Sequence, residues 1–210
     1  MNRFIITDSL PERVIMTDDP ARVRAISSHY VDRVETMYEH RGMIGCSGEY
    51  QGVALAMISC GFGESAAILY LEEAVSLGAR ELIYLGEGIS LTRGVNLMDV
   101  VIPKGGSQIL EKLIVTIANS IPIPVKMIET ITYDRFWCSG VNVQEERGWD
   151  ITDFAAGAVQ AVSSARGVSA AVILTISENS VTDERVSEET RQVGFNEASV
   201  LALRTLSDLS

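Results

Sequence analysis

The stretch VALAMISCGFG, residues 53–63, decides the fold. Its mostly apolar part, 53–60, predicts a buried strand, and the GFG that follows turns the chain. The turn leads into a helix expected over 65–77, and Gly78 is a typical end for that helix. A buried strand that runs through a glycine turn into a helix is the building unit of a layered α/β domain.

The same alternation extends outward along the chain. Further strands are expected at 13–17, 81–85, 100–102, 125–131 and 170–176. Further helices are expected from Asp19–Pro20 onward, along apolar stripes at 109–117 and 151–162, and over 183–206. The residues 86–88, GEG, are expected to form a turn after their strand, and Gly167 to end a helix. The pattern predicts an α/β fold with a largely parallel or mixed sheet.

Composition narrows the function. Apolar residues make up 47% of the 210 residues, which is enough for a sizeable core, and the formal net charge is −11. A surface this acidic argues against nucleic acid and against membranes as partners. Three widely spaced cysteines and no signal-peptide pattern favour a cytoplasmic protein with free thiols. With two histidines in the chain, we expect neither a metal site nor a cofactor.

The candidate site follows from the predicted sheet. Ligands of parallel α/β sheets bind at the carboxyl ends of the strands. The segments that follow the predicted strands lie at 17–19, 61–63, 86–88, 132–134 and 177–179.

Several segments carry a resemblance to a known family. They include RGMIG at 41–45, GEYQG at 48–52, GFG at 61–63, LMDVVI at 97–102 and TISE at 175–178. They resemble the hexameric-type nucleoside phosphorylases, the family of bacterial purine nucleoside phosphorylase and uridine phosphorylase, and this chain looks like a divergent member.

The resemblance covers nearly the whole chain. It implies one nucleoside phosphorylase-like domain over 1–210, a three-layer α/β/α phosphorylase/hydrolase-like fold with a central mixed sheet. It also implies cleavage of an N-glycosidic bond by phosphate, and a homo-oligomer, either a dimer or a hexamer of dimers.

The implied phosphate site differs from the family pattern. Arg22 and Arg41 match the phosphate-binding arginines, and the family places the second of these in a neighbouring subunit. Asp18 stands where the family has glycine, Tyr84 where it has arginine, and Glu87 where it has a hydroxyl residue. Each change makes the site less favourable for an anion. As structural alternatives, Asp18 serves a helix N-terminus and the arginines form surface ion pairs.

The implied substrate site is also altered. The family reads ribose hydroxyls with a Glu-Met-Glu run, and the run aligned with it is Asp153, Phe154 and Ala155, the last of which accepts no hydrogen bond. Phe136 matches the aromatic residue that stacks on the base, and the resemblance also implies that Tyr84 contacts the substrate. Alternatively, Asp153 serves a helix N-terminus and the aromatic residues are core.

The catalytic acid is the best preserved feature. The family uses an Asp after a strand, paired with an Arg thirteen residues on, and Glu178 and Arg191 have that separation. The structural alternative is a Glu–Arg ion pair that braces the last helix.

The sequence therefore predicts a nucleoside phosphorylase-like protein that binds a nucleoside or its base and cleaves the glycosidic bond with phosphate. Two alternatives stay open: a non-catalytic relative with a degenerate phosphate and ribose site, and a nucleosidase that uses water.

Overall fold

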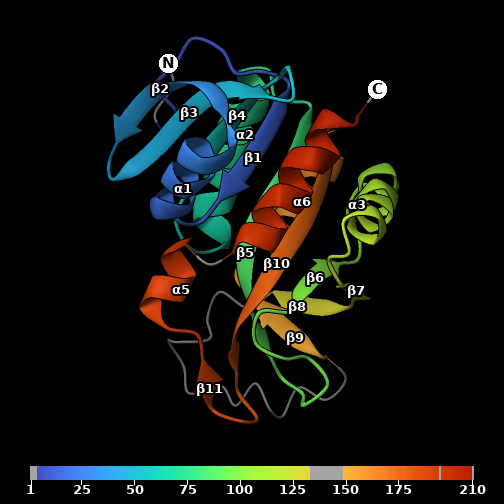
Figure 1. Cartoon of the computed structure of the whole chain (residues 1–210). Helices are drawn as coiled ribbons and strands as arrows, with labels where there is room; N and C mark the ends of the chain where they lie inside the picture. The colour runs from blue at the N-terminus through green and yellow to red at the C-terminus, as the bar shows by residue number, and fades with distance from the viewer. Residues whose placement is uncertain (1–3, 133–148, 194, 210) are drawn as a thin grey trace.

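The computed structural model describes residues 4–132, 149–193 and 195–209. A twisted sheet forms the middle layer, and helices cover both of its faces (Figure 1). This arrangement confirms the predicted three-layer α/β/α fold with a mixed sheet.

Parallel strands form the centre of the sheet. Within the described residues the main path runs β2-β3-β4-β1-β5-β10-β6-β7. The four central strands are all parallel to one another: β4 (Val53–Ser59), β1 (Arg13–Thr17), β5 (Glu81–Ser90) and β10 (Ser169–Asn179). The antiparallel strands β2 (Asp32–His40) and β3 (Met43–Tyr50) extend one edge, and β6 (Val100–Pro103) and β7 (Val125–Ile128) extend the other.

Two apolar cores lie on opposite faces of the sheet. Along β1, Val14 and Met16 face one core, and Ile15 faces the other. The first core lies under α2 (Glu64–Ser76) and α4 (Ala156–Arg166). The second lies under α1 (Pro20–Tyr30), α3 (Gln108–Ser120) and α6 (Asn196–Ser207). The short helix α5 (Glu188–Val193) packs against α1.

The local signals near the helix ends are confirmed. Asp19 caps α1, because its Oδ1 accepts a hydrogen bond from the backbone N–H of Ala21 at 2.7 Å. Gly167 ends α4 in the left-handed conformation, with φ of 67°.

Cys46 and Cys60 are buried free thiols, and burial raises the pKa of Cys60. No helix of the described chain is both long and apolar enough to span a membrane.

The turn predicted at residues 86–88 is wrong. These residues continue β5, which runs parallel to β10 through this segment. The glycines serve close packing: a Cβ on Gly86 would lie 2.6 Å from the ring of Tyr84, and one on Gly88 would lie 3.0 Å from Ile176. Glu87 therefore lies within β5, and its side chain points to the face of the sheet opposite to that of Gly86 and Gly88.

Three other predicted elements are divided. The start of the 151–162 helix is instead β9 (Ile151–Asp153), which pairs with β5 and with β8 (Thr130–Thr132). The strand predicted over 125–131 breaks between β7 and β8. The last predicted helix divides into β11 (Glu184–Arg185), α5 and α6. A new cap explains the start of α5, since the hydroxyl of Ser187 accepts a hydrogen bond from the N–H of Thr190.

Candidate functional site

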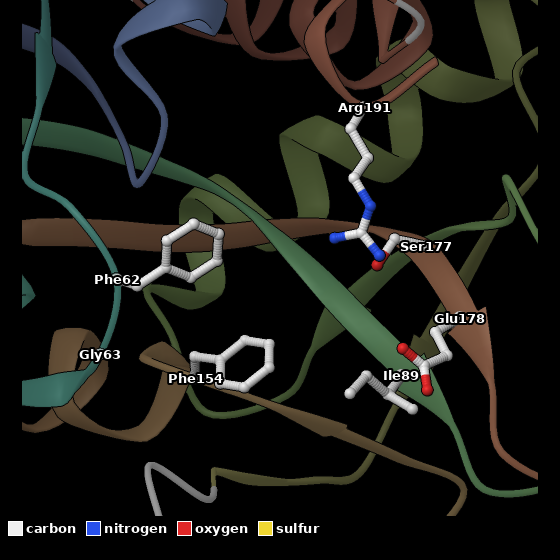
Figure 2. A pocket seen from close by; sticks show the side chains of 7 residues that line it. All are labelled: Phe62, Gly63, Ile89, Phe154, Ser177, Glu178 and Arg191. Atoms are coloured by element: carbon white, nitrogen blue, oxygen red, sulfur yellow. The ribbon is translucent and has the colours of Figure 1, made fainter. Parts of the chain in front are cut away.

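A pocket of about 300 Å³ lies at the carboxyl ends of the central strands. It is lined by Phe62, Gly63, Ile89, Phe154, Ser177, Glu178 and Arg191 (Figure 2). Two of the strand-end segments predicted from sequence, 61–63 and 177–179, contribute to this lining. The position agrees with the rule that α/β sheets bind ligands at this edge.

Two backbone features shape the pocket wall. Gly63, at the start of α2, has φ of 96°, a conformation that residues with a Cβ rarely adopt. The register of β10 against β5 shifts between Ile176 and Glu178, which places a bulge at Ser177. Such a bulge redirects side chains beside a site.

One end of the pocket is apolar. Phe62 and Phe154 meet edge to face, with ring centroids 5.9 Å apart and planes at 84°. Ile89, on β5, also lines the pocket, opposite Glu178 in the register of β10 (Figure 2). Phe62 is 59% exposed, which is unusual for a large apolar side chain and is typical of a binding surface.

The other end is polar, and its charges are paired. Glu178 forms an ion pair with Arg185 at 3.1 Å, and Arg191 donates from Nη1 to Oε2 of Glu87 at 2.8 Å. The expected Glu178–Arg191 ion pair is therefore not present among the described side chains. β11 explains the difference, since it aligns Arg185 directly opposite Glu178 in an antiparallel pair.

Arg22 is not open to a ligand in this conformation. Its guanidinium donates from Nη1 to Asp18 at 2.7 Å and to Thr17 at 2.9 Å, and from Nη2 to Glu87 at 3.3 Å. The side chain is 3% exposed, and its opposite side is covered by the ring of Phe195, 4.8 Å from the guanidinium carbon. The candidate phosphate arginine thus lies in a cluster that supplies its own carboxylates.

Burial dominates the electrostatics of this cluster. Desolvation raises the pKa of Asp18 to about 6, and the charge of Glu87 acts in the same direction, while the guanidinium of Arg22 opposes both. The phenol of Tyr84 lies nearby in the core, and burial raises its pKa well above the ordinary value. Tyr84 is not among the pocket-lining residues of the described chain.

Asp153 has a structural partner for each oxygen. Its Oδ1 accepts from the backbone N–H groups of Ala155 at 2.9 Å and Ala156 at 2.6 Å, at the start of α4. The hydroxyl of Thr132 lies 3.0 Å from Oδ1 and 3.2 Å from Oδ2. Of the run expected at the sugar, Phe154 alone lines the pocket, and Ala155 is buried.

Arg41 and Phe136 are the two expected site residues not yet placed. Arg41 is exposed in the turn between β2 and β3, where its guanidinium covers the ring of Phe4 at 5.6 Å. Phe136 lies outside the described residues, so its expected stacking role stays a prediction.

The sequence reasoning assigned no role to Ile89 or Arg185. Ile89 follows a glycine-rich segment that favours a turn, so no local pattern indicated that it lies on a strand at the pocket. Arg185 belongs to a two-residue strand, and such a strand is too short to show a period.

The comparisons with known proteins agree with this architecture. The family model described as "Phosphorylase superfamily" matches residues 12–111. The chain is 27% identical to a purine nucleoside phosphorylase DeoD-type 2 of Vibrio parahaemolyticus, covering 92% of each chain. It is 28% identical to a DeoD-type enzyme of Exiguobacterium sibiricum, covering 95% of each.

Solved structures show the same fold. A uridine phosphorylase from Vibrio fischeri superimposes with a TM-score of 0.87 at 21% identity, over 99% of this chain and 98% of that one. A purine nucleoside phosphorylase from Toxoplasma gondii, in complex with immucillin-H, gives 0.85 at 16% identity, over 98% of this chain and 94% of that one. The chain therefore has the fold of these two solved phosphorylases. In sequence and in fold, the chain is similar to the nucleoside phosphorylases.

Proposed function

We propose that this protein binds a nucleoside-type ligand, a nucleoside or its base, in the pocket between Phe62 and Arg191, and that it does so without phosphate. The cluster around Arg22 is the observation that carries this proposal. In it, the carboxylates of Asp18 and Glu87 occupy the guanidinium face that a phosphate would need.

Charge explains why phosphate is a poor ligand here. The two carboxylates of Asp18 and Glu87 balance the two guanidinium groups of Arg22 and Arg191. At neutral pH an added phosphate would face two acids at close range, and a like charge at about 4 Å costs roughly 4 kcal/mol at an effective dielectric of 20. Of the three functions expected from the sequence, cleavage by phosphate is therefore the one that this arrangement of charges supports least.

One observation favours a second function, hydrolysis by water. Glu178 lines the pocket and is almost buried, so its carboxyl group is within reach of a bound ligand. A carboxylate there is suited to accept a proton from the attacking water. If the protein is a nucleosidase, Glu178→Gln lowers cleavage by about 10² or more. If it is a binding protein, no nucleoside is cleaved.

The test combines binding with turnover. We expect calorimetry to detect a ligand among adenosine, inosine, uridine and their bases, with an affinity that 10 mM phosphate does not change. Chromatography of the same mixtures should show no ribose 1-phosphate. Ligand binding that requires phosphate, or phosphorolysis at a measurable rate, would contradict the proposal.

A variant tests the reason for phosphate exclusion. Replacing the two acids together, Asp18→Gly with Glu87→Ser, frees both guanidinium groups and should create phosphate binding in the millimolar range or better. Glu39→Ser is the matched control, because it removes the acid from the exposed Arg24–Glu39 pair. Phosphate binding by the parent protein would show that the acids do not exclude it.

We also propose that the protein is a homo-oligomer built from dimers. Arg41 is exposed, and it would join a pocket only if a second copy presented it. Light scattering at micromolar concentration should give a dimer or a hexamer. A monomer would contradict both the assembly and the shared site.

We also propose that the protein is cytoplasmic and that residues 1–210 form a single domain. The free thiols support the first of these proposals. Buried unpaired cysteines are typical of a reducing compartment. Fractionation of cells that express the protein, followed by limited proteolysis, should find it in the cytoplasmic fraction with no stable fragment.

A further inference from the structure

We infer that the pocket selects a neutral, flat heterocycle that carries no sugar, that is, a free nucleobase in preference to its nucleoside or nucleotide. This inference rests on the proposed function, because it narrows the ligand class of the same pocket. Three properties of the lining lead to it: the aromatic end, the engaged sugar-side groups and the balanced charge.

The aromatic end provides a surface for a planar ring. The rings of Phe62 and Phe154 meet at one end of the pocket, and the aliphatic side chain of Ile89 lines it farther along, next to Glu178 (Figure 2). Such a lining buries the faces of an aromatic heterocycle, and it offers no hydrogen bond to a hydroxyl group.

The groups expected to hold a sugar already have partners or are buried. Oδ1 of Asp153 accepts from the N–H of Ala156 at the start of α4, Oδ2 accepts from the hydroxyl of Thr132 on β8, and Ala155 is 1% exposed. Phe154, between Asp153 and Ala155 in the chain, presents a phenyl ring to the pocket instead. A ribose placed against this ring would lose hydrogen bonds to water and gain none from the ring.

The polar groups of the described lining lie at the other end. Ser177, Glu178 and Arg191 project from β10 and α5, opposite the two phenyl rings (Figure 2). A hydroxyl, a carboxylate and a guanidinium together match the mixed donor and acceptor edge of a nucleobase.

The charge of the polar end favours a neutral ligand. The carboxylate of Glu178 is paired with Arg185, and the guanidinium of Arg191 is paired with Glu87. An anionic ligand, such as a nucleotide, would have to compete with buried Glu87 for Arg191. The volume of about 300 Å³ is at the small end of the range for ligand pockets, which also suits a base without its sugar.

The experiment compares matched ligands on the intact protein. Calorimetry at neutral pH would measure adenine, hypoxanthine and uracil against adenosine, inosine and uridine, and against their 5′-monophosphates. We expect at least one base to bind as tightly as its nucleoside or more tightly, and its monophosphate to bind at least tenfold more weakly than the base. A nucleoside that binds tenfold more tightly than its base would overturn the inference and leave the proposed function standing. Binding of neither class would overturn both.

Two variants of Phe154 separate the effect of the aromatic ring from the effect of a missing hydrogen-bond acceptor. Phe154→Glu places a hydrogen-bond acceptor where a ribose would lie, so the ratio of nucleoside to base affinity should rise about tenfold. Phe154→Leu removes the ring without adding an acceptor, so base affinity should fall about 2- to 10-fold with no gain for the nucleoside. Ile109→Ser, at an exposed position of α3 that does not line the pocket, is the control for which no change is expected. An equal ratio in both Phe154 variants would contradict the inference, and the parent comparison tests it even if Phe154→Glu does not fold.

Discussion

The carboxylate of Glu87 lies 2.8 Å from the guanidinium of Arg191, and this contact joins the middle of the sheet to α5. The other oxygen of Glu87 accepts from Arg22 at 3.3 Å, so one buried carboxylate connects two arginines. Arg191 also lines the pocket. The position of one pocket wall therefore depends on a residue that does not line the pocket itself.

Removing Arg22 tests how far this cluster supports the fold. Arg22→Met leaves Asp18 without its guanidinium partner and Glu87 with Arg191 alone, and both acids are almost fully buried. Loss of one partner from a buried ionic group typically costs about 3–5 kcal/mol. We expect a loss of that size in the free energy of unfolding, measured with urea.

The same helix offers a matched control. Arg24 is paired with Glu39 on the surface, with both side chains more than half exposed. Arg24→Met should change the free energy of unfolding by about 1 kcal/mol or less. Equal losses in Arg22→Met and Arg24→Met would show that the buried cluster contributes no more than a surface pair.

The pKa of Asp18 predicts a pH dependence of stability. Burial raises this pKa to about 6 against an unfolded value of 3.8, with Glu87 and Asp19 acting in the same direction and Arg22 opposing. The folded protein therefore holds the proton more tightly than the unfolded chain. The resulting stabilisation is fully present below about pH 4 and is lost as the pH rises through 6, in total about 3 kcal/mol.

A neutral variant isolates this effect. Asp18→Asn cannot titrate, so the difference in unfolding free energy between parent and variant should change by about 3 kcal/mol between pH 4 and pH 7, in favour of the variant at pH 7. Other acids, including Asp153, titrate in both proteins and cancel. Parallel stability curves over this range would mean that Asp18 keeps an ordinary pKa.

The role of Asp153 can be separated from ligand binding. Asp153→Ala removes the cap of α4 and the partner of Thr132, and we expect it to cost about 1–3 kcal/mol in the free energy of unfolding. Asp153→Asn keeps an acceptor oxygen and should lose less. Ligand affinity should stay within twofold in the variants that fold, because this carboxylate faces the helix. A larger change in affinity in Asp153→Asn would restore the residue to the substrate site.

Local patterns were enough to predict the architecture. The strand, turn and helix around residues 53–78 and the cap at Asp19 depend on neighbouring residues alone, so sequence reasoning could find them. The strand-end rule also placed two of its five segments at the pocket. Each of these depends on interactions over a few residues or on a general property of parallel sheets.

The sequence did not allow us to predict which charged residues of the site pair with each other. Glu178 and Arg191 have the spacing expected of a pair, yet each bonds to a residue brought by another strand. The glycines at 86 and 88 favour a turn locally, but the side chains of Tyr84 and Ile176 require them within a strand. Such outcomes depend on long-range packing, which no local pattern contains.

Removal of Arg191 should lower the stability of the protein much more than removal of Arg185. Arg191→Ala leaves the buried carboxylate of Glu87 with one partner instead of two, and Arg191 is itself only 27% exposed. We expect a loss of about 1–3 kcal/mol in unfolding free energy and about tenfold weaker ligand binding, because α5 loses its contact with β5. Arg185→Ala breaks a pair in which the guanidinium is 54% exposed, so stability should change by about 1 kcal/mol or less. Urea unfolding and calorimetry on both variants make the comparison. If Arg185→Ala proved the more damaging for stability, Glu178 rather than Glu87 would be the carboxylate that organises this end of the pocket.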